Sequence, residues 1–533
     1  LMAGSSGSRP GAATVAFGGW LVVAGVVLLW MGRGMWTASD DWMLVGPRAW
    51  SDPASLLRDH NQHFSLVPVV IYKVMFLLVG FTDYWPYRVL SVLIHLAVVV
   101  LVWAIMKRIG VSGWVAMICA SVLALYNGGS LVVAQFQMPL ALALSLGVVL
   151  AAMVTHTLLW SKVIGSALAC LAVATSGIAI PVLAAAAVIA WRRRSLATAA
   201  LLVGPASAVY LAWFLWDSPF GSQPEGWKPS IAGAFAWLVV GMQEVARTIA
   251  GGSVLALILV VAVIAGLVRA VRSRDVRLLE PFVLAGAAGV VLLLAYLGRG
   301  DDPEAVYQSR FMYIASALLL PVVAVGAQGL VSRGMQWGLL IAVPLLVGLT
   351  VNVQQLSEEV DLNRKFQNVQ RVLVAGMLRS PAGADTPAWV RPWWSTVYWG
   401  VGDTTWGFLR DAYAQGRLDL DDIDVPPAQQ AAALISLRMP QLGGSPSGAC
   451  IPHAQPVRRT VAPGTRIGFR GGNSEPDRST IGVSRAGVPG AHYYWSDATG
   501  DTILVVGDDP ETGEPLEVEF AAGSPGTTFY LCD

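Results

Sequence analysis

Two adjacent carboxylates follow the first long apolar run of the sequence. Asp40 and Asp41 come a few residues after the apolar stretch near 14–32 and directly before Trp42. Like charges this close favour a shared proton, which suits a general base, and a charged pair beside a membrane is costly unless it is solvated or used. The pattern therefore leaves two alternatives, a catalytic acid pair or a solvated helix terminus.

A polar run precedes the apolar segment 66–81. It covers residues 59–63 and contains His60 and His63. Such a loop can fold back over the mouth of a membrane domain, where imidazoles hydrogen-bond a polar substrate. Helix capping, with interface anchoring by the aromatic residues that follow, is the alternative. We take His60, His63 and Trp42 as the candidate contacts to a sugar or an acceptor.

An arginine begins a later apolar run. Arg310 follows the acidic turn 301–304 and precedes Tyr313. A guanidinium group in this place can bind a phosphate at the depth of the lipid headgroups through two hydrogen bonds. The alternative is an interfacial arginine that only extends its charge toward water.

The elements that must position these residues are membrane helices. Charged residues make up 13% of the 533-residue chain and hydrophobic residues 55%, which excludes an ordinary soluble enzyme and a disordered chain. We expect a mainly α, polytopic membrane protein with about eleven transmembrane helices. The apolar runs lie near 14–32, 87–106, 113–128, 131–153, 163–175, 177–191, 196–215, 253–271, 281–297, 312–331 and 337–354.

Basic loops predict the orientation. With a cytoplasmic N-terminus in the plasma (inner) membrane, the strong basic clusters all fall inside. This alternation of inner and outer loops holds only if two apolar segments, 66–81 and 231–250, lie in the outer interface and do not cross the membrane. The charged residues in both segments favour this placement. If either crossed, a basic loop would fall on the wrong side. The inner clusters are Lys107–Arg108, Lys162, Arg192–Arg194, Arg272–Arg277 and Arg333.

The chain divides by charge. Residues 1–354 hold 21 basic and 13 acidic residues, a net +8, and residues 355–533 hold 14 and 21, a net −7. Neither block is basic enough to suggest nucleic acid. We expect four parts: a disordered or processed end (1–13), a transmembrane domain (14–354) with external loops 33–86, 216–252 and 298–311, an external helical, Trp-rich connector (355–447), and an external β-rich domain (448–533).

Short alternating segments in the last part predict a small antiparallel β-domain. They lie at 465–470, 480–486, 491–495, 502–506, 516–520 and 527–531, with Gly, Pro and Asp between them. Cys450 and Cys532 bracket this region and can form a disulfide on an oxidising side of the membrane. Cys119 and Cys170 lie in apolar runs and are interpreted as packing residues.

These motifs, in this order, resemble those of the GT-C glycosyltransferases. Members of this superfamily place an acidic pair in the first external loop, as Asp40–Asp41 does here, and interfacial helices after it. A Tyr–Arg pair then enters the second membrane helix, here Tyr87–Arg88. The stretch 309–313 is similar to the Arg-Tyr-x-Tyr motif of protein O-mannosyltransferase-like members, with Phe311 in the first Tyr place. The resemblance covers about 14–354 and extends to arabinosyltransferase-like members.

The resemblance implies a reaction. A sugar passes from a polyprenyl-phosphate donor to a glycan or glycolipid acceptor of the cell envelope, at the outer face and with inversion. Asp40 or Asp41 acts as the general base, with Asp40 favoured, and Arg310 with Arg88 and Tyr313 binds the donor phosphate. A divalent cation such as Mg, Mn or Ca is compatible with the external carboxylates but not required by them.

Two other classes of protein remain as alternatives. A lipid or glycan flippase would carry charge within its membrane helices and often an internal repeat, whereas charge is nearly absent from the apolar runs and no internal repeat is seen. A non-catalytic envelope assembly protein would place its function in a glycan-binding tail and would not need Asp40–Asp41.

Overall fold

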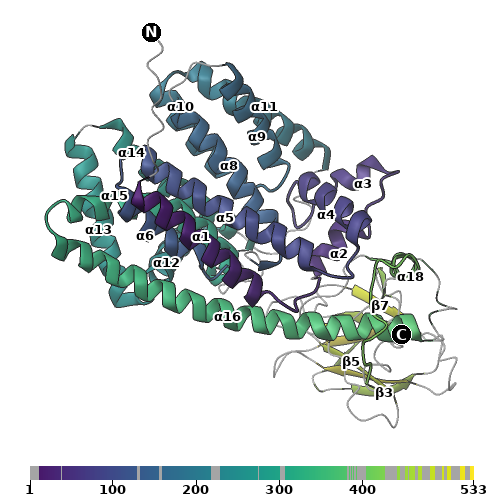
Figure 1. The fold of residues 1–533 in the computed structure, drawn as a ribbon. Coiled ribbons are helices and arrows are strands. Elements are labelled where there is room, and N and C mark those ends of the chain that lie inside the picture. Colours follow the sequence, from purple (N-terminus) through teal and green to yellow (C-terminus); the bar gives the residue numbers. More distant parts are fainter. Residues whose placement is uncertain are drawn as a thin grey trace. The chain divides into compact units, whose positions relative to one another are not determined.

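A computed structural model of the chain consists of long helices followed by a strand-rich part (Figure 1). It describes residues 11–426, apart from 38, 129–132, 155–158, 218–228, 274, 300–305 and most of 381–403, and beyond 426 it describes residue 455 and nine strands. The chain divides into two compact units. The helical unit comprises Leu1–Gly34, Leu57–Pro68 and Trp85–Asn363, and the mixed unit comprises Met35–Leu56, Val69–Tyr84 and Arg364–Asp533.

Each of the eleven apolar runs predicted to cross the membrane contains a helix. Most begin or end within a few residues of the expected bounds, and the last continues without a break through the predicted helix at 355–379. The helices are α1 (Ala12–Met31), α5 (Trp85–Arg108), α6 (Gly113–Ala124), α8 (Gln137–Met153), α9 (Leu159–Val173), α10 (Ala179–Arg193), α11 (Leu196–Asp217), α13 (Ser253–Ser273), α14 (Val276–Arg299), α15 (Ser309–Val331) and α16 (Met335–Arg379).

Within the described ranges, seven of these helices are long and apolar enough to span a membrane: α1, α5, α11, α13, α14, α15 and α16. The other four have 12–17 residues, fewer than the roughly 20 of a typical span. In α15, 83% of the apolar window is buried by other parts of the protein, against 44% or less in the other six. The predicted mainly α, polytopic membrane fold is therefore confirmed, with α15 as its central helix.

Helices α13 and α15 cross with their backbones in contact. A Cβ atom on Gly326 would lie 1.9 Å from the carbonyl oxygen of Ala262, and one on Gly266 would lie 3.0 Å from the backbone nitrogen of Gly326. Only residues without a side chain allow this approach, and small residues at the crossing are typical of helix pairs in membranes. The crossing therefore fixes α15 against α13.

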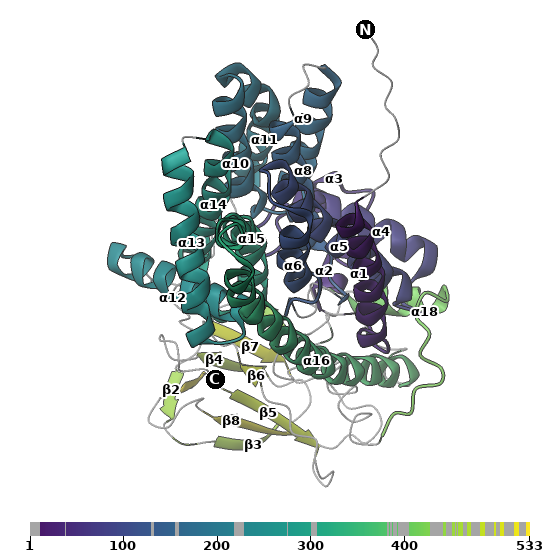
Figure 2. The ribbon, with the colours of Figure 1, turned by 60° about the vertical axis from the view of Figure 1, so that its left-hand side comes forward.

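Helix α12 (Ile231–Ala250) runs along one end of the helical unit and does not pass through it (Figure 2). At its start, the backbone N–H of Ser230 donates to Tyr296 Oη in the last turns of α14 (3.0 Å). At its end, the carbonyl of Thr248 accepts from Asn352 Nδ2 of α16 (2.8 Å). Neither α12 nor α4 (Leu66–Val79) is among the helices long and apolar enough to span a membrane. The placement of 66–81 and 231–250 in the outer interface stays a prediction.

The mixed unit joins segments that lie far apart in the sequence. Its helices are α2 (Ser39–Val45), α3 (Pro53–Leu57), most of α4, the last part of α16, and α18 (Trp406–Ala414). The N–H of Phe81 donates to the carbonyl of Arg417 (2.7 Å), and the N–H of Trp36 donates to Gln367 Oε1 (2.9 Å). Residues 35–56 and 69–84 of loop 33–86 therefore belong to the same unit as residues 364–426.

One glycine makes this approach possible. Gly80 adopts φ +62°, and a Cβ atom there would lie 2.4 Å from the carbonyl oxygen of Arg417.

The predicted helix at 405–417 is present as α18. Residues 427–438 of the predicted helix at 426–438 lie outside the described residues, as do Trp389, Trp393, Trp394 and Trp399 of the Trp-rich stretch.

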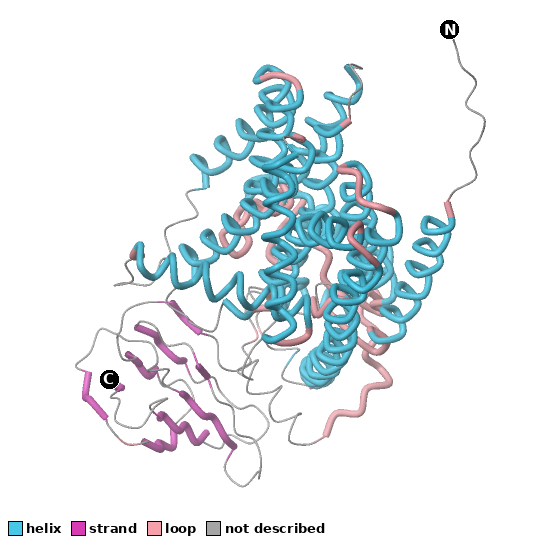
Figure 3. Tube along the Cα trace, turned by 90° about the vertical axis from the view of Figure 1, so that its left-hand side faces the viewer, coloured by secondary structure: helices cyan, strands magenta, loops and turns pink. Residues whose placement is uncertain are grey.

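The end of the mixed unit is an antiparallel β-domain, drawn in magenta in Figure 3. One sheet has the order β1-β7-β4-β9-β2 and the other the order β3-β8-β5-β6. Five of the six predicted β segments are present as strands β4, β5, β7, β8 and β9, and the segment 491–495 shares only Trp495 with β6, its other residues lying outside the described residues. Strands β1 to β3 were not predicted. The strands are β1 (Gln441–Gly443), β2 (Cys450–His453), β3 (Val457–Val461), β4 (Arg466–Arg470), β5 (Thr480–Arg485), β6 (Trp495–Ser496), β7 (Asp501–Val505), β8 (Leu516–Ala521) and β9 (Phe529–Cys532).

The cysteines fall into two groups. Cys450 is disulfide-bonded and lies opposite Cys532 in the register of β2 and β9. Cys119 and Cys170 are free thiols within α6 and α9.

Candidate functional site

The acidic pair begins α2 in the mixed unit, and its two carboxylates have different surroundings. Asp41 is 1% exposed, and its Oδ2 accepts hydrogen bonds from Tyr84 Oη (2.6 Å) and Thr37 Oγ1 (3.2 Å). Asp40 is half-buried. Successive helical residues point about 100° apart, so the two side chains do not face the same way. Asp41 is therefore anchored inside the unit, whereas Asp40 remains accessible.

Tyr84 is the donor in its contact with Asp41. Burial raises the pKa of the Tyr84 hydroxyl well above its ordinary value, and the negative charge of Asp41 raises it further. The phenol therefore keeps its proton at neutral pH. A buried carboxylate that accepts two hydroxyl hydrogen bonds has a fixed orientation, and this orients the first turn of α2.

The other end of α2 is fixed by two cations. Lys73 is buried and donates through Nζ to the carbonyls of Val45 (3.3 Å) and Arg48. Burial lowers the pKa of Lys73, and the charge of Arg48 contributes to the decrease. The Arg48 guanidinium in turn donates to the carbonyl of Met43 in α2 (3.4 Å) and to that of Ser55 in α3 (3.0 Å). Cations at a helix C-terminus bind its unpaired carbonyls, so these two residues stabilise the helix that carries Asp40.

Trp42 is a packing residue in this structure. It is fully buried, with its ring edge-on to Phe81 (centroids 4.9 Å apart) and to Trp36 (5.7 Å). A ring covered in this way offers no open face on which a sugar can stack. The sequence-based assignment of Trp42 to sugar contact is therefore replaced by a role in holding α2.

A tight loop in the helical unit brings the two predicted histidines together. The backbone N–H groups of His60 and His63 each donate to the other residue's carbonyl (3.0 Å). Asn61 and Gln62 between them adopt φ values of 51° and 64°, which non-glycine residues rarely do outside constrained sites. The Asp59 carboxylate accepts the N–H of Gln62 (2.9 Å). This conformation projects two imidazoles from one turn.

Two helices hold the loop in place. Phe64 stacks on Trp213 near the end of α11, with centroids 5.0 Å apart. The Trp213 indole donates to the carbonyl of Leu57 (2.8 Å), and the Asp59 N–H donates to Asp217 Oδ2 (2.7 Å). Gln137, the first residue of α8, donates to Ser65 Oγ (2.8 Å). The loop is therefore fixed where α11 ends and α8 begins.

His63 lies in a positive field. Burial lowers the pKa of His63 to about 4, with further contributions from His60 and then from two arginines. These are Arg310, in the first turn of α15, and Arg299, the last residue of α14. His63 is therefore neutral at pH 7, although cations surround it. We refer to His60, His63, Arg299 and Arg310 as the cationic cluster.

Two other predicted phosphate ligands have partners inside the helical unit. Arg88 is buried and donates to the carbonyl of Gly32, just after α1 (2.6 Å). Tyr313 lies one turn after Arg310, but its hydroxyl is bonded to His95 Nδ1 inside the bundle (2.9 Å) and is fully buried. The structure therefore joins Arg310 with the histidines, which the sequence placed in a separate sugar site, and gives Arg88 and Tyr313 internal contacts.

Arg299 was not predicted from the sequence, although a signal was present. It ends α14, and Arg310 begins α15 after a short connection. Two antiparallel helices joined by a short loop bring these ends together, so the spacing of 299 and 310 already indicated two neighbouring guanidinium groups.

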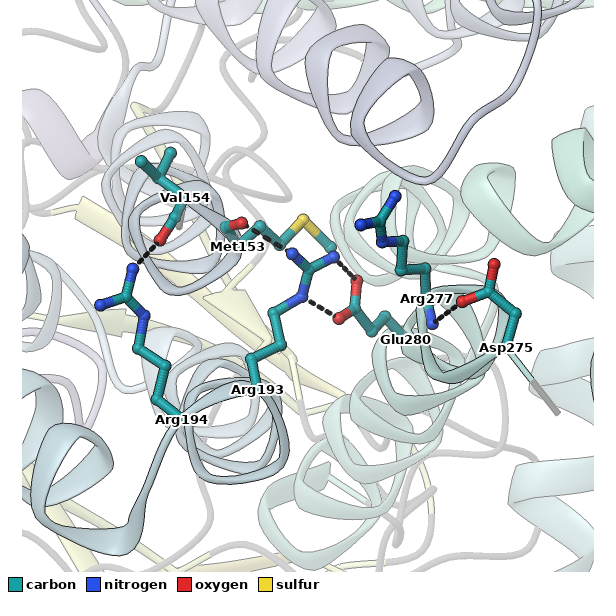
Figure 4. Close-up of polar contacts among 7 residues, drawn as sticks. All are labelled: Met153, Val154, Arg193, Arg194, Asp275, Arg277 and Glu280. Carbon is teal, nitrogen blue, oxygen red and sulfur yellow. Dashed lines mark hydrogen bonds and ion pairs between the residues drawn. The ribbon is translucent and has the colours of Figure 1, made fainter. Parts of the chain in front are cut away.

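A second group of arginines lies at the other end of α14 (Figure 4). Arg193 forms two hydrogen bonds with the Glu280 carboxylate, one of them 2.9 Å long, and donates to the carbonyl of Met153 (2.8 Å). Arg194 donates to the carbonyl of Val154. Glu280 is 3% exposed. This group, the Arg193 cluster, joins the ends of α8 and α10 to the start of α14.

No metal site is assigned. Among the described residues, no three His, Cys, Asp or Glu side chains gather as a metal ion would require. The acidic turn 301–304 lies outside those residues.

Comparison with known proteins adds one distant likeness. No protein-family model matches the chain, and no curated protein matches it. Among solved structures, the chain is similar to the crystal structure of ArnT from Cupriavidus metallidurans in the apo state, with 15% sequence identity and a TM-score of 0.47 over 75% of this chain and 85% of that chain. At these values the likeness assigns neither activity nor substrate.

Proposed function

We propose that this protein is a GT-C-type membrane glycosyltransferase. In this proposal it transfers a sugar from a polyprenyl-phosphate carrier to a hydroxyl group of a cell-envelope glycan or glycolipid, at the external face of the membrane. The observation that supports it most is the cationic cluster: Arg299 ends α14, Arg310 begins α15, and the charges of both contribute to lowering the pKa of His63. A polyprenyl chain stays in the bilayer, so its phosphate lies at the depth where membrane helices end.

Arg310 is the proposed ligand of the donor phosphate. A guanidinium group can donate two parallel hydrogen bonds to phosphate oxygens, and the contact strengthens where water is scarce. It would also stabilise the charge that develops on the phosphate as the sugar leaves. Arg310 donates at present to the side-chain amide of Gln308, a neutral partner that a phosphate can displace.

Asp40 is the proposed general base. It removes the proton from the acceptor hydroxyl as the oxygen bonds to the anomeric carbon, and the bond from that carbon to the phosphate oxygen breaks with its electron pair going to the phosphate. Asp40 is the accessible member of the pair, and Asp41 is fixed by Tyr84 and Thr37. Asp41 is therefore proposed as a positioning residue.

The decisive experiment supplies purified protein with a radiolabelled polyprenyl-phosphate sugar and an envelope acceptor. Wild-type protein should transfer label to the acceptor, and Asp40→Asn should lower the rate by roughly 10²–10⁴-fold, the usual contribution of a general base. Asp411→Asn, in the exposed α18, is the matched control and should retain the wild-type rate.

The same experiment separates the alternatives. A flippase would move the labelled lipid across the bilayer without cleaving it, and an assembly protein would do neither. A wild-type rate in Asp40→Asn would remove the base from the proposal, and no transfer with any polyprenyl-phosphate sugar would reject the function.

A further inference from the structure

Three polar side chains of the helical unit lie together near the start of α15. Gln355 and Glu359 are one helical turn apart, on the same face of α16. Gln355 Oε1 accepts a hydrogen bond from Nδ2 of Asn127, which follows α6 (3.5 Å). The Glu359 carboxylate accepts from Oγ of Ser309, the first residue of α15 (3.3 Å). We refer to Asn127, Gln355 and Glu359 as the polar strip.

A buried asparagine fixes this part of α16. Asn352 lies one turn before Gln355 and is fully buried. Its Oδ1 accepts from the backbone N–H of Asn127 (2.9 Å), and its Nδ2 donates to the carbonyls of Thr248 (2.8 Å) and Gly348 (2.7 Å). A buried amide whose oxygen and nitrogen are both bonded has a fixed orientation. The polar strip is therefore held in one geometry by contacts that do not depend on a ligand.

Each member of the polar strip can form further hydrogen bonds. Among the described residues, Asn127 Oδ1 is buried and has no partner. In the same part of the chain, the side-chain N–H groups of Gln355 have no acceptor and the half-buried carboxylate of Glu359 has no donor other than Ser309. A carboxylate accepts up to about four hydrogen bonds. The strip therefore presents two acceptor groups and one donor group to a ligand.

The hydroxyl groups of a sugar match this combination. Each hydroxyl donates one hydrogen bond and accepts others, so a carboxylate and an amide side by side can bind hydroxyls on neighbouring carbon atoms. A phosphate fits poorly, because the charge of Glu359 repels an anion. A metal ion also fits poorly, since no three His, Cys, Asp or Glu side chains of the described chain gather around one point.

Ser309 connects the polar strip with the proposed phosphate ligand. It directly precedes Arg310 in the first turn of α15, and its hydroxyl contacts Glu359. The Arg310 guanidinium donates to the side chain of Gln308. A sugar bonded to a phosphate on Arg310 would extend from it by the length of one ring. The carboxylate that contacts the neighbouring residue is placed to meet that ring.

We propose that Glu359, with Gln355 and Asn127, binds hydroxyl groups of the donor sugar and so selects the donor. The inference rests on the proposed function, because it locates the sugar from a phosphate on Arg310. Glu359 forms hydrogen bonds only, and no proton or covalent bond is transferred to it. A site built to hydrogen-bond a hydroxyl strongly rejects a ligand that lacks it, because polar atoms of the site then stay unpaired.

The test compares two kinds of probe that bind the full chain in lipid nanodiscs. One is a short prenyl phosphate, and the other is the set of its esters with mannose, galactose and arabinofuranose. Glu359→Gln should raise the Kd of the ester that wild-type protein binds most tightly by roughly 10–150-fold, the range for a hydrogen bond to a charged group. The same variant should not raise the Kd of prenyl phosphate, which has no sugar.

Two further variants are controls. Glu358→Gln changes the adjacent carboxylate, which is exposed and accepts from Gln354 Nε2 (3.0 Å), and should bind both kinds of probe as wild type does. Ser309→Ala removes one donor to Glu359 but keeps the carboxylate, so it should still bind the ester. If the Ser309 contact only joined α15 to α16, Ser309→Ala and Glu359→Gln would lower the melting temperature alike and change neither Kd.

The outcomes separate this inference from the proposed function. If an ester binds and its sugar is transferred while Glu359→Gln keeps the wild-type Kd, the inference is wrong and the function stands. If Glu359→Gln weakens the ester and prenyl phosphate equally, the carboxylate does not act on the sugar, and the inference is again wrong. If no sugar ester of a prenyl phosphate binds or is transferred, both fail.

Discussion

The two ends of α14 both gather arginines, and they use them differently. In the Arg193 cluster the guanidinium group of Arg193 is matched to the Glu280 carboxylate, and its remaining donor binds a helix-end carbonyl (Figure 4). In the cationic cluster, Arg299 and Arg310 add to the effect of burial and of His60 in lowering the pKa of His63. The first arrangement joins helices. In the proposed function the second binds a phosphate, so the two ends of α14 would use arginine for structure and for binding.

Removing one member of the Arg193 cluster should have the largest effect on stability. Arg193→Ala leaves the nearly buried Glu280 without its cation, and breaking a buried pair from one side costs about 3–5 kcal/mol of unfolding free energy. Denaturant unfolding in detergent measures the loss, and sugar transfer by the remaining folded protein should be unchanged.

A double replacement provides the control for that loss. Arg193→Leu with Glu280→Leu removes both charges, and replacing a buried pair by apolar residues is often neutral or stabilising. Stability close to wild type is expected in the double variant. An equal loss in the single and the double variant would mean that Arg193 acts through its contact with Met153 and not through the ion pair.

Arg310 should show the opposite profile. Arg310→Ala should slow transfer by roughly 10–150-fold, which corresponds to the 1.5–3 kcal/mol of a charge-assisted hydrogen bond, with little change in thermal stability. Arg310→Lys should transfer sugar at a rate between those of wild type and Arg310→Ala, because lysine keeps the charge but loses the planar guanidinium group. Donor KM and melting temperature for both variants, with Arg333→Ala as control, provide the measurement.

An interfacial arginine without a ligand would give a different pattern. Lysine would then replace Arg310 fully, and alanine would lower the melting temperature while donor KM stayed the same. That pattern would make Arg310 a structural residue like Arg193. The arginines at the two ends of α14 would then have the same kind of role.

Asp41 on α2 is a buried anion that is held by hydroxyl groups and not by a cation. Tyr84→Phe removes a hydroxyl donor from Asp41, and a buried acceptor that loses a partner costs about 1–3 kcal/mol. Thr37→Val should cost less, because its hydrogen bond to the same oxygen is longer. Urea unfolding measures both, and equal stability of Tyr84→Phe and wild type would mean that Asp41 is not anchored by the phenol.

An ion pair with one exposed partner should show the smallest effect. Arg247 and Glu244 form two hydrogen bonds on α12, and the Arg247 side chain is 51% exposed, whereas that of Glu244 is 15% exposed. Pairs near the surface contribute about 0–1 kcal/mol, so Arg247→Gln, which changes the exposed partner, should alter stability within that range and should respond to salt. A loss as large as that of Arg193→Ala would show that burial does not govern the strength of these pairs.

The sequence predicted the elements better than their association. Apolar runs and alternating strands carry a local signal, so the membrane helices and strands β4, β5 and β7 to β9 were predicted. Strand β3 was missed because two arginines interrupt its apolar pattern. The contact of Trp36 with Gln367 joins residues 331 positions apart, and no local pattern indicates it. The same reason hid the link between Tyr84 and Asp41.

The candidate site was predicted in its parts. Arg310, His60 and His63 were identified from residue type and place, but the sequence divided them between a phosphate site and a sugar site. Their union depends on how loop 57–65 folds against α14 and α15, which backbone conformation at Asn61 and Gln62 determines. The different surroundings of Asp40 and Asp41 depend likewise on α2 being a helix, since an extended strand would not separate them by the same angle.

The glycine crossing of α13 and α15 also bears on Arg310. At Gly326 the two backbones touch, so any side chain at this position would push α15 away from Ala262. Arg310 stands on the first turn of the same helix, so the crossing contributes to setting the depth of its guanidinium group. In the proposed function, the phosphate of the donor would have to reach Arg310 at that depth.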